Sequence, residues 1–227
     1  MNTAYNFYVT LIFSIIVQFI TGVIELGTLL IKIDPAQIIL RQLLILEIVV
    51  QIVEAFFYFW LVYNFNKVTN VTPKRYIDWA ITTPTMLITL VLYLIYLKYE
   101  ESGIDTAKLN FFNLIRENSS NISYILSLNW LMLIFGYLGE AKIINTITGV
   151  ILGFIPFLIY YYIIYANYAN QSENGWKLFL YFFFFWSLYG IVAVLPYYLK
   201  NTFYNILDLF AKNFFGLFLS YILIMKR

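Results

Sequence analysis

Seven long apolar runs dominate this chain, at residues 6–31, 38–64, 75–98, 121–140, 143–168, 176–198 and 202–225. A helix needs about 20 residues to cross the roughly 30 Å hydrocarbon core of a bilayer, whereas a membrane strand needs only about 10 and alternates in polarity. Hydrophobic residues make up 62% of the chain and charged residues 11%, which is too apolar for a water-soluble surface. The sequence therefore predicts an all-α membrane protein, a single domain of residues 1–227 built as a bundle of seven transmembrane helices.

The residue types that are missing exclude several kinds of chemistry. The chain has no cysteine and no histidine, which removes disulfides, thiol nucleophiles and the commonest metal ligands. A net charge of +2 is not typical of a nucleic-acid-binding protein. No basic stretch with a small-residue cleavage site precedes the first run, so we expect no cleaved signal peptide.

The positions of Lys and Arg predict the orientation. With the N-terminus outside, the inner segments contain eight of these residues and the outer segments five. Because inner loops carry the excess of positive charge in membrane proteins, we predict an outer N-terminus and a cytoplasmic C-terminus. The inner residues are Lys32, Arg41, Lys98, Lys108, Arg116, Lys177, Lys226 and Arg227, and the outer ones are Lys67, Lys74, Arg75, Lys142 and Lys200.

Ionisable residues inside the apolar runs point to a functional site. Each costs about 2.5–3.5 kcal/mol to insert near mid-membrane. Asp208 and Lys212 lie one helical turn apart on one face of the last run, and Asp78 lies in the third. One explanation is a structural ion pair that offsets its own insertion cost. The other is that Lys212 is a reactive amine that forms a Schiff base with an aldehyde, with Asp78 and Asp208 as counterions.

Four segments resemble the helices of microbial rhodopsins. Arg75-Tyr-Ile-Asp-Trp-Ala-Ile-Thr-Thr-Pro84 is similar to the third helix of that family, and Leu207-Asp-Leu-Phe-Ala-Lys212, followed by Gly216, is similar to the seventh. Trp186-Ser-Leu-Tyr189 resembles the sixth, and Asn129-Trp-Leu-Met132 with Gly136 resembles the fourth. The segments occur in the family's order, with the lysine in the last span.

The resemblance implies a photoreceptor, rather than an enzyme, with all-trans retinal bound covalently to Lys212. Asp78 would be the primary counterion and proton acceptor and Asp208 the second, with Arg75, Thr82 and Thr89 associated with them. Residues 143–168 lack the family's usual tryptophan, so the fifth helix cannot be aligned. The retinal pocket would be lined by Trp79, Thr83, Met86, Met132, Gly136, Trp186, Tyr189, Gly190 and Ala211. Gly190 stands where proton pumps usually have proline, and Ala193 replaces a further pocket tryptophan.

Polar side chains recur at three- or four-residue spacing in the first, second and last runs. Polar groups within a membrane must be hydrogen-bonded or hydrated. Rows of polar side chains that face one another therefore predict a hydrated path beside Lys212. Hydrogen bonds between helices, worth about 0.6 kcal/mol each, are the alternative explanation. The stripes are Asn6, Thr10, Ser14, Gln18, Thr21 and Glu25 in the first run, Glu47, Gln51, Glu54 and Tyr58 in the second, and Asn205, Asp208 and Lys212 in the last.

Within the family, the chain is most similar to the group I viral rhodopsins of giant viruses that infect algae. Glu47 and Glu54, seven residues apart, carry this resemblance together with Asn205, three residues before Asp208. It implies a light-gated channel in the host cell membrane that passes monovalent cations and is inhibited by calcium. Ser14, Glu54 and Asn205 would form a central gate, with Glu47 and Arg75 at the inner and outer constrictions. Gln51 and Tyr58 would line the ion path, and calcium would act at Glu47 and Glu54.

Two other functions stay open. A proton pump needs a carboxylate donor eleven residues after Asp78 on the third helix, and Thr89 occupies that position. A slow outward proton pump would therefore need Glu47 as an unusual donor. A photosensory role is the third possibility, although no segment after Arg227 could couple a transducer domain. The expected partners are lipid, protons and cations, and not nucleic acid.

Overall fold

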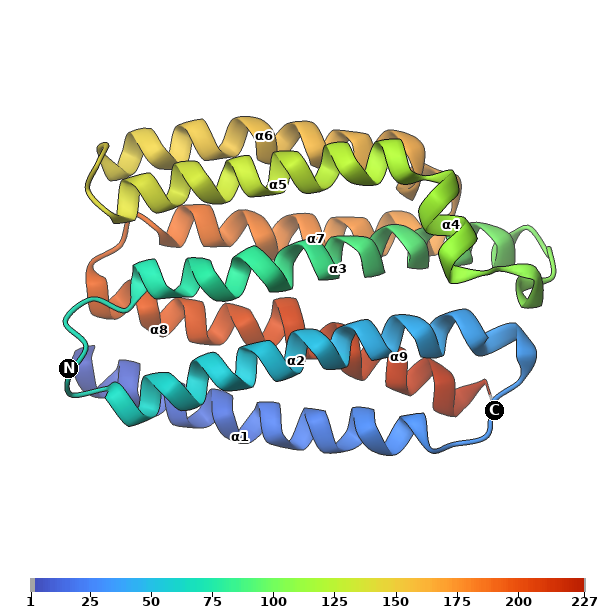
Figure 1. Ribbon diagram of the computed structural model, residues 1–227, viewed down its shortest axis with the longest axis horizontal. Helices are drawn as coiled ribbons and strands as arrows, with labels where there is room; N and C mark the ends of the chain where they lie inside the picture. The colour runs from blue at the N-terminus through green and yellow to red at the C-terminus, as the bar shows by residue number, and fades with distance from the viewer. Residues whose placement is uncertain (1–2, 227) are drawn as a thin grey trace.

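The computed structural model describes residues 3–226, and seven helices in that range are long and apolar enough to cross a membrane (Figure 1). This confirms the predicted all-α, seven-helix fold class; Arg227, counted above among the inner basic residues, lies outside the described residues. The first six spans are α1 (Thr3–Leu29), α2 (Ile38–Asn64), α3 (Thr72–Glu101), α5 (Ser119–Glu140), α6 (Thr146–Asn167) and α7 (Glu173–Val192). The last span consists of α8 (Tyr197–Asp208), a five-residue π-helix η4 (Leu209–Asn213) and α9 (Phe214–Met225).

Capping side chains in the connections fix where several helices begin. The side-chain oxygens of Asn145 and Ser172 accept hydrogen bonds from backbone N–H groups in the first turns of α6 and α7. Asn110 does the same for the short helix α4 (Phe111–Glu117). The connection between α3 and α5 thus contains a helix of its own, preceded by the 3-10 turn η2 (Thr106–Lys108).

The predicted connection between the last two spans, at residues 199–201, is wrong. α7 ends at Val192 and α8 begins at Tyr197, directly after Pro196, which cannot donate a helical hydrogen bond. Lys200 lies inside α8, and its Nζ lies 2.5 Å from an oxygen of Glu140 on α5. Lys200 is therefore a buried amine inside a helix and not a loop residue, and the ion pair with Glu140 compensates its charge.

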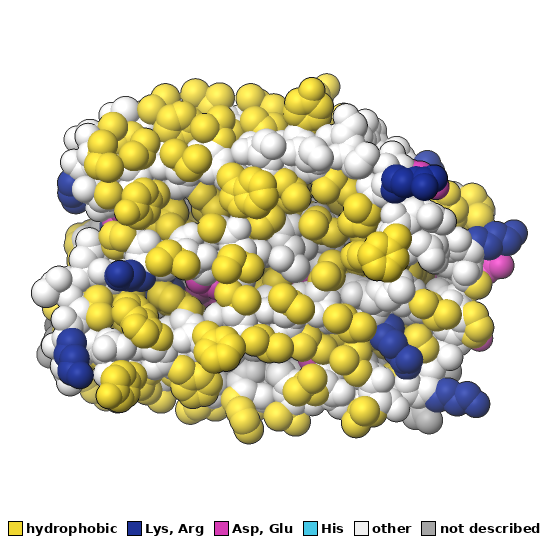
Figure 2. Space-filling view, in the orientation of Figure 1, with side chains coloured by type: hydrophobic (Ala, Val, Ile, Leu, Met, Phe, Trp, Pro, Cys, Tyr) yellow, Lys and Arg dark blue, Asp and Glu magenta, His cyan; other side chains and the backbone are white. Residues whose placement is uncertain are grey.

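The two termini lie at opposite ends of the bundle (Figure 1). We call the end with the N-terminus the outer end and the end with the C-terminus the inner end, following the predicted orientation. α1 contacts α2, α8 and α9, and α2 contacts α3 and α9, so the polar stripes predicted on the first, second and last spans face one another. Hydrophobic side chains are spread over the whole visible face, and Lys and Arg side chains lie mostly toward its two ends (Figure 2).

Candidate functional site

Lys212 is buried in the middle of the last span, within the π-helix η4. A π-turn bonds each residue to the fifth along and is rare in proteins, where single turns of this kind are frequent at functional sites. Three carboxylates surround the amine. Nζ lies 2.7 Å from Asp78 Oδ2, 3.5 Å from Glu54 Oε1 and 3.7 Å from Asp208 Oδ1.

The three carboxylates differ in their hydrogen bonds. Asp208 accepts a hydroxyl hydrogen on each oxygen, from Tyr58 and Tyr189, both at 2.7 Å. Asp78 Oδ1 and both oxygens of Glu54 have no hydrogen-bond partner. Asp78 therefore makes the short contact with Lys212 and keeps a free oxygen, which makes it the carboxylate best placed to receive a proton from that nitrogen.

Arg75 lies on the outer side of this cluster and is fully buried. Its Nη1 is 3.4 Å from Asp208 Oδ2, and it donates to Asn201 Oδ1 at 3.0 Å and to Asn205 Oδ1 at 2.5 Å. Asn201 was missed as a site residue because the connection was predicted at its position. The heptad-like spacing of Asn201, Asn205 and Asp208 along one helix is the signal that could have found it.

Thr82 and Thr89 do not bond the carboxylates with which they were associated. Each hydroxyl donates to the backbone carbonyl one turn earlier, of Asp78 and Thr85 respectively. Thr83 also bonds its own helix and accepts a hydrogen bond of 2.7 Å from Asn129 on α5. These threonines therefore stabilise helix α3 and its contact with α5, and they do not hydrogen-bond the carboxylates Asp78 and Asp208.

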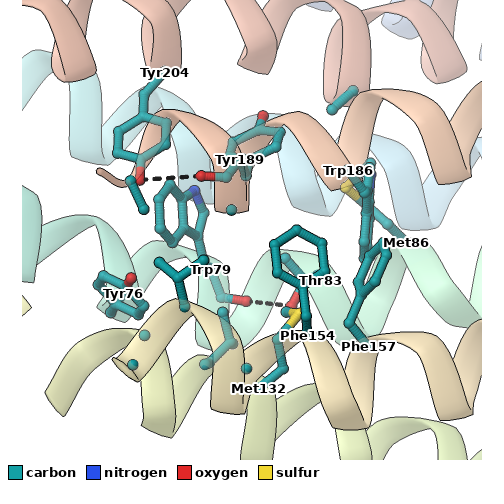
Figure 3. Close-up of a pocket in the computed structure, with 18 of the residues that line it drawn as sticks. Tyr76, Trp79, Thr83, Met86, Met132, Phe154, Phe157, Trp186, Tyr189 and Tyr204 are labelled. Carbon is teal, nitrogen blue, oxygen red and sulfur yellow. Dashed lines mark hydrogen bonds between the residues drawn. The ribbon is translucent and has the colours of Figure 1, made fainter. Parts of the chain in front are cut away.

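A largely apolar cavity begins at Lys212 and runs between α3, α5, α6 and α7. Aromatic rings from three of these helices surround one space in Figure 3: Trp79 on α3, Phe154 and Phe157 on α6, and Trp186 on α7. Every residue predicted to form the pocket lines this cavity: Trp79, Thr83, Met86, Met132, Gly136, Trp186, Tyr189, Gly190 and Ala211.

The residues of α6, which the sequence could not align, complete the far end of the cavity. They are Gly149, Val150, Gly153, Phe154 and Phe157. A Cβ atom at Gly190 would lie 2.6 Å from the Phe154 ring, so the glycine on α7 makes room for the phenylalanine on α6. Tyr76 and Tyr204 were also missed, and both lie at the outer wall of the cavity.

The predicted central gate is only partly assembled. Ser14 Oγ donates to the backbone oxygen of Asn205 at 3.1 Å, while the Asn205 amide donates to Thr10 Oγ1. Glu54 hydrogen-bonds neither Ser14 nor Asn205, so the three predicted gate residues do not form one hydrogen-bonded group. Its carboxylate lies instead beside Lys212, whose positive charge attracts it.

A bridge of amide groups lies on the inner side of Lys212. Asn213 Nδ2 donates to Gln51 Oε1 at 3.0 Å, and Gln51 Nε2 donates to the backbone oxygen of Gln18 at 2.8 Å. We call these three residues the amide bridge; it joins α1, α2 and η4. Glu47 lies one turn further inward on α2, close to Thr89.

Within residues 3–226, no group of three or more acidic, histidine or cysteine side chains could hold a metal ion. Calcium at Glu47 and Glu54 would thus need further ligands, because Ca²⁺ takes six to eight oxygens.

The chain is similar in fold to several solved rhodopsins. It aligns with the crystal structure of viral rhodopsin OLPVRII at 29% identity and a TM-score of 0.79, with 99% of each chain covered. Xanthorhodopsin, described as a light-driven ion pump with dual chromophore, aligns at 18% identity and a TM-score of 0.75, covering 99% of this chain and 94% of that one. A blue light-absorbing proteorhodopsin from Med12 aligns at 19% identity and a TM-score of 0.73, covering 99% and 98%.

No curated protein sequence gives a significant match. The sequence model of the family described as "Bacteriorhodopsin-like protein" matches residues 9–225, nearly the whole chain. The order of the helices, the buried lysine in the last span and this match agree, and we conclude that the chain belongs to the bacteriorhodopsin-like family of microbial rhodopsins.

Proposed function

We propose that this protein is a light-gated cation channel whose chromophore is retinal held covalently at Lys212. Membership of the rhodopsin family implies retinal, and the cavity suits a long, flat, apolar molecule that ends at an amine. Trp79, Trp186 and Phe157 would contact its polyene chain, and the glycines near Phe154 would leave space for its ring. When bound, retinal supplies absorption of visible light and a change of shape from all-trans to 13-cis.

The carboxylates give the Lys212 nitrogen a proton acceptor. A positive charge at this nitrogen is stabilised by Asp78 at 2.7 Å, and the same contact is short enough for direct proton transfer. Asp208 is held by two tyrosines and Arg75, so it stays in place when the proton moves. Transfer to Asp78 neutralises the ion pair and weakens the hold of Lys212 on the neighbouring carboxylates.

The observation that carries the channel proposal is the row of buried polar side chains along α1, α2 and the last span. Its carboxylates Glu54 and Glu47 have no hydrogen-bond partners, and carboxylates along a narrow pore favour cations. The amide bridge closes the path in the dark, and its Asn213 directly follows Lys212 in η4. Movement of Lys212 therefore pulls on the bridge, and its opening would let water and cations pass between the level of Glu54 and the level of Glu47.

The remaining features of the proposal concern ions and place. Monovalent cations and protons would pass, Arg75 would narrow the outer end, and Ser14 with Asn205 would bring α1 against the last span. Calcium would inhibit the current at Glu47, since Glu54 is engaged by Lys212. We place the protein in the membrane of a virus-infected host cell, by its resemblance to viral rhodopsins.

A slow outward proton pump is the second candidate function. Thr89 cannot supply a proton on α3, but Glu47 is buried close to it with both carboxylate oxygens unpartnered. Glu47 would then be the donor that returns a proton to Lys212.

Photocurrent measured against voltage separates the two functions. In cells that express the protein with retinal, a channel gives a current that reverses sign near the equilibrium potential of the permeant cation and moves with its gradient. A pump gives an outward current of one sign over a wide voltage range. Outward current that ignores the cation gradient would overturn the channel proposal.

A further inference from the structure

Two carboxylates near the inner end of the bundle have no partner of opposite charge. Glu25 on α1 is 1% exposed and Glu47 on α2 is 2% exposed. Both oxygens of Glu47 and one oxygen of Glu25 make no hydrogen bond. Ionised carboxylates in such surroundings are costly, so the pair needs an explanation that ordinary packing does not give.

The two side chains share one level of the bundle. On α2, Glu47 precedes Gln51 by four residues, and on the last span Gly216 follows Asn213 by three. At 1.5 Å per helical residue, Glu47 and Gly216 therefore each lie about 5 Å inward from the amide bridge. The Glu25 carboxylate lies directly against Gly216, where a Cβ atom would overlap it. Glu25 and Glu47 also interact electrostatically. The pair therefore lies one turn from the amide bridge, on the side away from Lys212.

The buried cations of residues 3–226 are all engaged elsewhere. They are Arg75, Lys200 and Lys212, which pair with Asp208, with Glu140 and with the cluster around Asp78. Arg41, the basic residue on α2 nearest to Glu47, donates to the backbone oxygen of Ile31. Two buried carboxylates without a cation cannot both carry a negative charge at an acceptable cost, so at least one holds a proton or a bound ion.

Thr89 on α3 lies at this level, and Ser220 on α9 lies one turn further inward than Gly216. Ser220 on α9 is buried, and its hydroxyl oxygen has no hydrogen-bond partner. Thr89 on α3 lies near Glu47, with its hydroxyl already donating to its own helix. The unpartnered oxygens of Glu25, Glu47 and Ser220 number four, fewer than the six to eight that Ca²⁺ takes. A proton shared between carboxyl groups needs no more ligands than are present.

We propose that Glu25 and Glu47 together form a proton store, a carboxyl pair that holds one proton in the dark and returns it to the Lys212 nitrogen after that nitrogen has given its own proton to Asp78. The proposal rests on the proposed photoreceptor function, but it holds for a channel or a pump. It makes Glu25 a partner of Glu47, whereas the pump alternative needs Glu47 alone.

The proton balance is simple. The N–H bond at Lys212 breaks, and its proton forms an O–H bond on Asp78. The O–H bond of the carboxyl pair then breaks, and its proton restores the N–H bond. The pair is left with two negative charges and takes up the next proton from the aqueous phase at the inner end, while Asp78 releases its proton to the aqueous phase at the outer end, which restores the starting state. The amide bridge lies between the pair and Lys212, so the return step waits until the bridge opens.

Infrared spectra of the purified protein in the dark test the store without any light reaction. In calcium-free buffer we expect the carbonyl band of a protonated carboxyl group, shifted in Glu25→Gln and in Glu47→Gln and absent in the double variant. Glu117→Gln, which changes an exposed carboxylate at the same end, should leave the band unchanged. A double variant with the wild-type band would overturn the proposal, as would a band that appears only when Na⁺ and K⁺ are removed, since an ion would then occupy the pair.

Flash spectroscopy then tests the return of the proton. Glu25→Gln and Glu47→Gln should each slow the recovery of visible absorption by about tenfold or more, the low end of what a positioned proton donor contributes. The double variant should be no slower than the slower single variant, and added azide, a small diffusible acid, should restore the rate. Wild-type recovery in Glu25→Gln would overturn the pair and leave Glu47 as a lone donor.

Glycine variants test the geometry without removing a charge. Gly216→Ala places a methyl group against the Glu25 carboxylate, so it should shift the carboxyl band and slow recovery. Gly27→Ala on α1, where a Cβ meets nothing within 4 Å, is the matched control. These measurements use purified protein, and the dark spectra need no pigment, so they are independent of the current–voltage test. Failure of the channel proposal and failure of the proton store are thus separate results.

Discussion

Replacing Glu54 by glutamine tests whether this residue acts on the charge at Lys212. Glu54 Oε1 lies 3.5 Å from Nζ, close to the 2.7 Å of Asp78 and the 3.7 Å of Asp208. With an effective dielectric constant of about 20, Coulomb's law gives roughly 5 kcal/mol for the Glu54 contact, 6 for Asp78 and 4.5 for Asp208. Glu54 would thus supply about a third of the attraction at the nitrogen.

The expected result is a change of colour as well as of current. Light excitation moves positive charge away from the nitrogen, so removal of a nearby anion lowers the excitation energy, by at most the roughly 5 kcal/mol of the contact. We expect Glu54→Gln to absorb at longer wavelength and to lose most of its passive photocurrent. If Glu54 acted only in gating, the absorption spectrum of the variant would be nearly unchanged, so the colour distinguishes the two roles.

Absorption spectra and photocurrents of Glu54→Gln and Glu47→Gln in one cell system provide the measurement. Glu47 is the matched control for colour, because seven helical residues place it about 10 Å further along α2. An unshifted spectrum in Glu54→Gln would show that Glu54 carries no charge beside Lys212 in the dark. Wild-type passive current in the same variant would remove it from the ion path.

Four further changes test other parts of the site. Lys212→Ala should abolish visible absorbance in retinal-supplemented protein; a coloured variant at wild-type yield would contradict the covalent attachment. Asp78→Asn should shift absorption to longer wavelength and block proton transfer from the Lys212 nitrogen, as time-resolved spectra would reveal; a normal deprotonated species would assign the acceptor role to another carboxylate. Gln51→Leu removes both hydrogen bonds of the amide bridge, so current should rise or close more slowly after a light pulse, and unchanged closing kinetics would argue against the bridge as the inner gate. Glu140→Gln leaves Lys200 buried without its ion partner, and thermal unfolding should show a loss of about 3–5 kcal/mol, whereas wild-type stability would mean that Lys200 finds water.

Hydrophobic periodicity and local motifs were enough to predict the seven spans and most of the residues that line the cavity. The seven runs predicted the spans because membrane helices must be long and apolar, and the pocket residues on α3, α5 and α7 lie in motifs with fixed spacing along a helix. Lys212, Asp78 and Asp208 stood out because a charge is expensive in an apolar run.

Tertiary contacts decided what the sequence could not predict. Lys200 looked like a loop residue because its partner, Glu140, lies sixty residues away. Glu54 matched a gate motif, but the charge of Lys212 holds it in another place. The α6 wall of the cavity has no motif of its own, because Phe154 fits only against a glycine on a different helix.

The winding of the last span has a consequence for the evolution of its inner half. A residue of an α-helix advances the chain by about 100°, and the π-turn of η4 absorbs one residue more than an α-turn would. Deleting a single residue between Asp208 and Asn213 would therefore restore a continuous α-helix with Gly216 still facing α1, whereas winding all the present residues as α-helix would rotate Gly216 by roughly that angle. Asp208 and the outer half would keep their places. The π-turn thus lets the last span gain or lose one residue at this point while both halves keep facing the same neighbours, and sequence comparisons of the span need a gap here to match residues that occupy the same position in space.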